Sequence, residues 1–92
     1  MDQKLHLTAR QCKAGRALLG WSQRDLAAAA SVHHRTVLDF ENGARSPIDA
    51  TLSAMRLAME AAGVVFIPAN GGGQGVRLKE PELDVKQARI LA

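Results

Sequence analysis

The sequence has few of the residues that stabilise small proteins through covalent bonds or large aromatic contacts. Among its 92 residues there are one cysteine (Cys12), one tryptophan, two phenylalanines and no tyrosine. A single cysteine excludes an internal disulfide and fits a reducing compartment. A run of about 18 apolar residues, which a membrane-spanning helix needs, is also missing, and no secretory signal is visible. We therefore expect a soluble, cytoplasmic protein with no membrane partner.

The hydrophobic core that this composition allows is thin. Hydrophobic residues make up 47% of the sequence, but alanine supplies much of that share. The length suits one small domain. Dimerisation is one way for such a domain to bury more surface.

The positive charge lies in the N-terminal half. The net charge is +3, and residues 47–92 carry as many acidic as basic side chains. The excess therefore falls on residues 1–46, as a surface facing phosphates requires. An ordinary solvated surface would carry the same charge, so this excess alone does not decide the function.

Capping residues and glycines divide the first two thirds of the chain into four expected helices. Thr8 is placed to cap the first, and Gly20 ends it. Ser22 and Asp25 have the spacing of a capping box for a second helix over residues 23–30.

The third expected helix covers residues 33–42, with Gly43 as its left-handed terminator. Residues 46–49 combine a serine cap, a proline in the first turn and an acid at the third position, which predicts the start of a fourth helix. Gly63 ends that helix. Its apolar residues, spaced three and four apart, predict an inward-facing stripe: Ile48, Leu52, Met55, Met59 and Ala62.

Residues 23–43 form the most informative segment. Their apolar residues follow helical spacing that is interrupted once and then resumes, at Leu26, Ala27, Ala30, Val32, Val37 and Phe40. Two helices that cross steeply over a short turn need a small residue where they touch, and Ala27 supplies it. Ser31 lies in the expected turn.

This segment closely resembles the Cro and lambda-repressor type of helix-turn-helix, the XRE family. Gln23 stands where that family opens its first motif helix, Val32 follows the turn, and residues 41–43 (Glu-Asn-Gly) are the usual ending. The resemblance covers about residues 8–63. Ser31 departs from it, because the family usually has glycine there, and a positive φ costs a non-glycine residue roughly 1 kcal/mol.

The resemblance places the N-terminal part of the third helix in the DNA major groove. It assigns base contacts to His34, Arg35 and Asp39, and we add Thr36 and Leu38 as contacts to a thymine methyl group. A guanidinium can bond guanine O6 and N7 together, and Asp39 is placed to orient Arg35 or to accept from a cytosine amine. The alternative is that Arg35 and Asp39 form only a solvent-exposed pair.

A second set of residues is expected to bind DNA phosphates. Gln23 lies at a helix N-terminus, where backbone amides favour an anion. The other candidates for phosphate contact are Arg24, His33, Asn42 and Arg45, although plain surface polarity explains each of them equally well. The resemblance also implies a partly buried ion pair between Arg16 and Glu41.

Other chemistry is not indicated. His33 and His34 are neighbours on a helix and point about 100° apart, so they suit no shared metal, and Cys12 completes no ligand set. The glycine-rich residues 70–75 lack the lysine and hydroxyl residue of a phosphate-binding loop. No serine, cysteine or carboxylate pair has catalytic partners. We therefore expect no metal, no cofactor and no enzymatic activity.

The C-terminal third has a different pattern. Residues 64–67 are β-branched and aromatic, and residues 76–79 alternate apolar and basic, which predicts a β-hairpin around the glycine-rich turn. The XRE family usually has a fifth helix here, so the hairpin stands on its own evidence. The expected divisions are a DNA-binding domain over residues 1–63, the hairpin over 64–79, and a charged tail over 80–92 with a brief helix from Asp84 to Leu91.

The hairpin is the expected dimerisation element, because an apolar edge strand is a hazard in a monomer and a lone hairpin is marginal in water. The residues assigned to dimerisation are Val64, Val65, Phe66, Ile67, Val76 and Leu78. The alternatives are a wing that grips DNA through Arg77 and Lys79, or strands that only cover the fourth helix of their own chain.

Together these observations predict a mainly α, lambda-repressor-like domain of four helices with a C-terminal β-hairpin. The expected function is a homodimeric transcriptional regulator, most simply a repressor that occupies a pseudo-palindromic operator in double-stranded DNA. The alternative is an antitoxin or antiactivator that uses the same scaffold to mask a protein partner.

Overall fold

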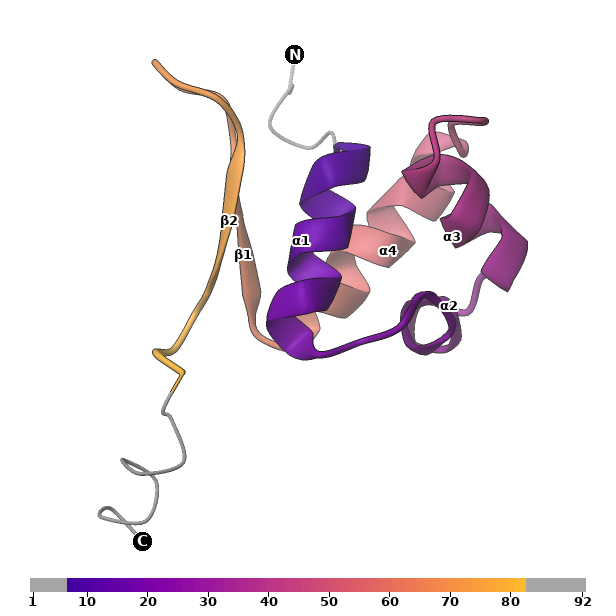
Figure 1. Cartoon of the computed structure of the whole chain (residues 1–92), viewed down its shortest axis with the longest axis horizontal. Coiled ribbons are helices and arrows are strands. Elements are labelled where there is room, and N and C mark those ends of the chain that lie inside the picture. The colour runs from indigo at the N-terminus through magenta and orange to yellow at the C-terminus, as the bar shows by residue number, and fades with distance from the viewer. Residues whose placement is uncertain (1–6, 83–92) are drawn as a thin grey trace, which may run out of the picture.

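The computed structural model describes residues 7–82, which form four helices followed by a two-stranded antiparallel sheet (Figure 1). The elements are α1 (Ala9–Leu19), α2 (Gln23–Ala30), α3 (His34–Glu41), α4 (Asp49–Ala61), β1 (Val64–Ile67) and β2 (Gly75–Leu78). The predicted fold class is confirmed. The brief helix expected over 84–91 lies outside the described residues.

Local hydrogen bonds set the beginnings of the first two helices as the sequence predicts. Thr8 and Gln11 form a capping box at α1, and Ser22 and Asp25 form one at α2. Each box satisfies backbone N–H groups that the first turn of a helix leaves unpaired. Ser31 ends α2 with φ of 58°, so the helix-turn-helix turn has the left-handed conformation although it lacks glycine.

The predicted start of α4 was wrong. The helix begins at Asp49, its N-cap is Ile48, and no side chain caps it, so Ser46 does not have the expected role. Residues 42–48 instead form the connection from α3 to α4, and Ile48 has an extended backbone. Ile48 is therefore not on the helix, and its side chain is 73% exposed instead of facing the core. Ala62 is likewise exposed, at the end of α4.

The core lies where the four helices meet. Its most completely buried side chains come from every helix, namely Leu26, Met55, Met59, Val37 and Cys12. Ala27 is also buried at the α2–α3 crossing, as the motif requires. Gly15 of α1 lies against the hairpin, and a Cβ atom there would approach Phe66 Cζ to 3.2 Å, so the absence of a side chain lets the two elements pack closely.

The hairpin packs on α1 and α4 of its own chain. The register pairs Val64 with Leu78 and Phe66 with Val76, and these four side chains pack inward. Val64 is only 2% exposed. The side chain of Val64 is therefore part of its own core, and of this residue only the backbone is left to contact a partner.

Gln11 joins α1 to the hairpin. Its buried amide nitrogen donates to the Gly75 carbonyl at 2.9 Å and to the Ile67 carbonyl at 3.4 Å. Its amide oxygen accepts from the Thr8 N–H at 3.1 Å. One side chain thus caps a helix and ties both strands to it.

Candidate nucleic-acid interface

The outer surface of α3 carries an exposed arginine, Arg35, whose side chain is oriented by a neighbouring carboxylate. Arg35 is 71% exposed, and its Nε donates to Asp39 Oδ1 at 3.1 Å one helical turn later. This bond uses the inner nitrogen of the guanidinium and leaves both terminal amino groups without a protein partner among residues 7–82. A pair this exposed adds little stability, but it restricts the direction of the guanidinium.

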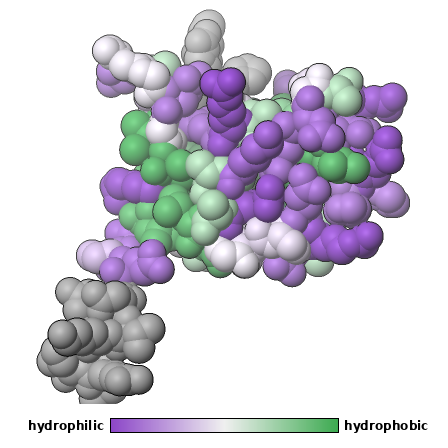
Figure 2. Space-filling view, viewed as in Figure 1, coloured by the Kyte–Doolittle hydropathy of each residue, from purple (hydrophilic) through white to green (hydrophobic). Residues whose placement is uncertain are grey.

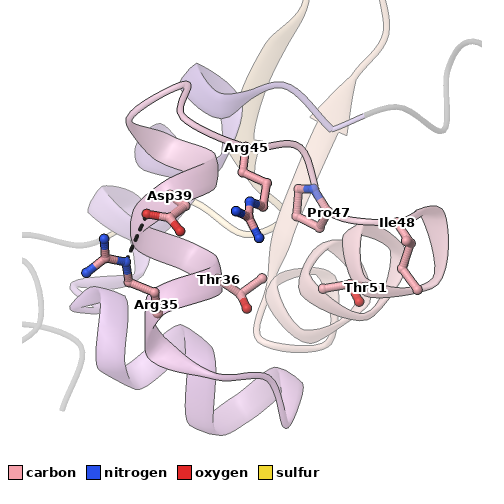
Figure 3. A pocket seen from close by; sticks show the side chains of 7 residues that line it. All are labelled: Arg35, Thr36, Asp39, Arg45, Pro47, Ile48 and Thr51. Carbon is pink, nitrogen blue, oxygen red and sulfur yellow. Dashed lines mark hydrogen bonds and ion pairs between the residues drawn. The ribbon is translucent and has the colours of Figure 1, made fainter.

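A cleft of about 260 Å³ lies beside this pair, between α3 and the start of α4. Figure 3 shows the side chains around it: Arg35, Thr36 and Asp39 from α3, Arg45 and Pro47 from the connection, and Ile48 and Thr51 at α4. Arg45 points into the space between the two helices. The structure therefore brings three of the proposed base-contacting residues together with one proposed phosphate contact.

The structure gives His33 a local role that sequence reasoning missed. Its Nδ1 accepts the backbone N–H of Arg35 at 3.0 Å, so His33 is the side-chain cap of α3. A histidine preceding a helix by one residue was the available signal. The ring remains exposed, and His34, which follows it, lies on the first turn of α3.

Gln23 is positioned by a hydrogen bond to the buried carboxylate of Glu41. Its Nε2 donates to Glu41 Oε1 at 3.0 Å, which ties the beginning of α2 to the end of α3. The same carboxylate accepts from Arg16, at 2.6 Å from Nη2 and 2.8 Å from Nε. Cys12 completes the group by donating its thiol to Glu41 Oε2 at 3.0 Å.

Burial and hydrogen bonding compete at Glu41, whose side chain is only 1% exposed. Burial alone would raise the pKa of this carboxyl, but the bonds from Arg16, Cys12 and Gln23 outweigh it and lower the pKa below 4.5. The bond to Glu41 raises the pKa of Arg16 against the opposing effect of burial. Burial, followed by the bond to Glu41, raises the pKa of the Cys12 thiol, which keeps it protonated.

The remaining expected contacts lie on or beside the motif with different exposures. Arg24, Asn42 and Arg45 are exposed, whereas Thr36 and Leu38 are half-buried. The cleft also includes Pro47, Ile48 and Thr51, which the sequence did not assign to the interface. Their place depends on how the connection between α3 and α4 runs, and no local pattern indicates it.

Other kinds of site are not seen in the described part of the chain. Residues 7–82 contain no cluster of three or more His, Cys, Asp or Glu side chains suited to a metal. No helix within that range has both the length and the apolar character to cross a membrane.

Comparison with known proteins agrees with this geometry. The sequence model of the helix-turn-helix family HTH_3 matches residues 13–59, about half of the chain, including all of α2, the turn and α3. No curated protein matches the chain. This match shows that the chain belongs to the XRE type of helix-turn-helix DNA-binding regulators, and the left-handed turn at Ser31 agrees with it.

Proposed function

We propose that this chain is a dimeric, sequence-specific repressor that acts in the cytoplasm by occupying a two-fold symmetric operator. In this proposal α3 enters the major groove, and its N-terminal side chains contact base edges. The beginnings of α2 and α4 approach the phosphates on either side.

The orientation of Arg35 is the observation that carries the proposal. Among the described residues only Asp39 bonds this side chain, and it binds Nε, so the two terminal amino groups are available for guanine O6 and N7. His34, Thr36, Leu38 and Asp39 are the other proposed base contacts. An arginine serving only solubility would gain nothing from this restraint.

Phosphate contacts are proposed for Gln23, Arg24, His33, Asn42 and Arg45. Gln23 keeps its amide oxygen and one N–H free of the bond to Glu41, so the backbone amides at the start of α2 and this side chain can bind one phosphate together. Arg45 beside the cleft supplies a cation next to Arg35.

Titration of the purified protein with a library of random duplexes tests the function. We expect enrichment of an inverted repeat whose half-site centres lie about one helical turn, roughly 34 Å, apart. The logarithm of the affinity for that repeat should fall linearly with the logarithm of the salt concentration. Equal, weak affinity for every duplex would contradict an operator-binding role.

Masking of a protein partner is the rival function. The outer face of the hairpin favours it, since Ile67 there is 40% exposed. The same titration separates the two functions, because an antitoxin or antiactivator that acts only through the hairpin has no need of salt-dependent binding to a particular duplex.

A further inference from the structure

The two edges of the hairpin differ in charge. β2 carries Arg77, and Lys79 is the first residue after the strand. Arg77 Nη1 also donates to the carbonyl of Leu78 at 3.2 Å. Charged side chains on an edge strand hinder pairing with another chain. β1 has the sequence Val-Val-Phe-Ile and carries no charge. The β1 edge is therefore the one that lacks this protection.

Backbone geometry shows which groups face the β1 edge. Lys79 N–H donates to the Gly63 carbonyl at 2.7 Å, so Gly63, Val65 and Ile67 direct their backbone groups toward β2. Val64 and Phe66, which alternate with them, direct theirs outward. Among residues 7–82, no backbone group outside the hairpin bonds to either of these two.

This edge is complementary to itself in one register. An antiparallel pair of β1 strands centred on Val65 sets Val64 opposite Phe66 of the partner subunit, and every outward N–H meets a carbonyl. A pair centred on Phe66 would place Val64 opposite Pro68, which has no N–H. A pair centred on Val64 would require Ala62, whose N–H already bonds within α4.

We propose that a second copy of this chain pairs with β1 in the register centred on Val65, so that two hairpins form one sheet of order β2–β1–β1–β2. The proposal rests on the dimeric regulator proposed above and names its interface. No charged residue then faces another across the two-fold axis. The charged β2 strands become the outer edges, where protection is needed.

The arrangement also suits DNA binding. In Figure 1 the hairpin lies on one side of the molecule and α3 on the opposite side, with α1 and α4 between them. In the same orientation, Figure 2 shows apolar residues gathered over the hairpin side and a mainly hydrophilic surface over the rest. A two-fold axis perpendicular to the sheet keeps the helices of both copies on one side, so both α3 helices remain free to face a single duplex.

Charge substitution at Val65 tests the register. In the proposed dimer this residue faces Val65 of the partner subunit, at the close spacing of a pair that shares no backbone bonds. Val65→Lys and Val65→Glu should each raise the dimer dissociation constant at least about tenfold in sedimentation equilibrium, because each sets like charges together. An equimolar mixture of the two variants should recover the dimer, because lysine then faces glutamate.

Matched variants keep the result interpretable. Ile67→Lys makes the same change on the same face of β1, but it lies opposite Gly63 of the partner subunit and should leave the dimer intact. Val65→Glu also lies opposite Arg77 of its own hairpin, so we expect its monomer to stay folded even if Val65→Lys unfolds. Circular dichroism checks the fold of each variant.

Each contrary outcome has a distinct meaning. A Val65→Lys protein that dimerises like the wild type, or a mixture that stays monomeric, overturns the β1 pairing. Leu57 is 55% exposed on α4 and represents an alternative dimer surface. If Leu57→Lys abolishes the dimer and the Val65 variants do not, the interface lies on α4. If a monomeric Val65→Lys protein still binds a half-site, the proposed DNA-binding function stands whichever interface forms the dimer. If the wild-type dimer binds no DNA, the proposed function itself is wrong.

Discussion

Arg16 and Glu41, 25 residues apart in the sequence, form a two-armed ion pair between α1 and the end of α3. The Nη2–Oε1 distance is 2.6 Å and the Nε–Oε2 distance is 2.8 Å. Gln23 and Cys12 bind the same carboxylate. This single buried group therefore fixes the end of α3 against both α1 and the beginning of α2, and with it the angle at which α3 is presented.

Removal of the carboxylate should destabilise the fold substantially. Glu41→Ala leaves the guanidinium of Arg16 without its partner in a poorly solvated place, and we expect a loss of about 2–4 kcal/mol in the free energy of unfolding. Urea unfolding of the variant measures it. Asp39→Ala is the matched control, since its pair with Arg35 is exposed and should cost less than about 1 kcal/mol. Equal, small losses in both variants would contradict a structural role for the buried pair.

The same carboxylate should make stability depend on acid pH. The pKa of Glu41 in the folded protein lies below its ordinary value of 4.5, so the ionised group contributes stability above that value and loses it as the pH falls through the folded pKa. The difference in unfolding free energy between the wild type and Glu41→Gln should therefore be largest near neutrality and should shrink below about pH 4.5. Unfolding curves measured from pH 7 downward check it, and a difference that does not change with pH would refute the assignment.

Local signals explain why much of the fold was predictable. Thr8, Ser22 and Gly43 act within one turn of their own positions, so their residue types alone indicate where helices begin and end. The helix-turn-helix was equally predictable, because Ala27 and the spacing of its apolar neighbours indicate two helices that cross over a short turn. The hairpin followed from the change of period after Gly63.

The errors fall where the outcome depends on distant parts of the chain. Ser46 has the sequence of a cap, but α4 begins at Asp49 because the chain must first cross from α3. Val64 looks like an edge residue by itself and is buried because α1 and α4 cover it. The contact of Gln11 with the hairpin had no signal in the sequence, since the Gly75 carbonyl that it binds lies 64 residues away.

Gln11 provides a test of how the hairpin is attached. Gln11→Glu keeps the acceptor for the Thr8 N–H but removes the donor to Gly75 and Ile67, whereas Gln11→Ala removes both functions. We expect each variant to lose about 1–3 kcal/mol, because carbonyl groups of the hairpin lose their partner. Amide hydrogen exchange should increase in β1 and β2 for both, and at the start of α1 mainly in Gln11→Ala. Exposed Gln74→Ala is the control, and unchanged exchange in the strands would show that packing alone holds the hairpin.

The last prediction separates sequence recognition from general affinity for DNA. Arg35→Ala should cost about 1–3 kcal/mol on the selected operator and relax the preference at one base pair, because the proposed bonds to guanine are lost. Asp39→Asn keeps an oxygen for Nε but removes the negative charge, so it should retain more discrimination than Asp39→Ala. Arg45→Ala should weaken specific and nonspecific duplexes alike and reduce the salt dependence, as expected for a phosphate contact. Arg77→Ala on the hairpin is the control. If it weakens DNA binding as much as Arg45→Ala, the hairpin contacts DNA as a wing. If Arg35→Ala leaves the base preference unchanged, α3 does not read the operator through this residue.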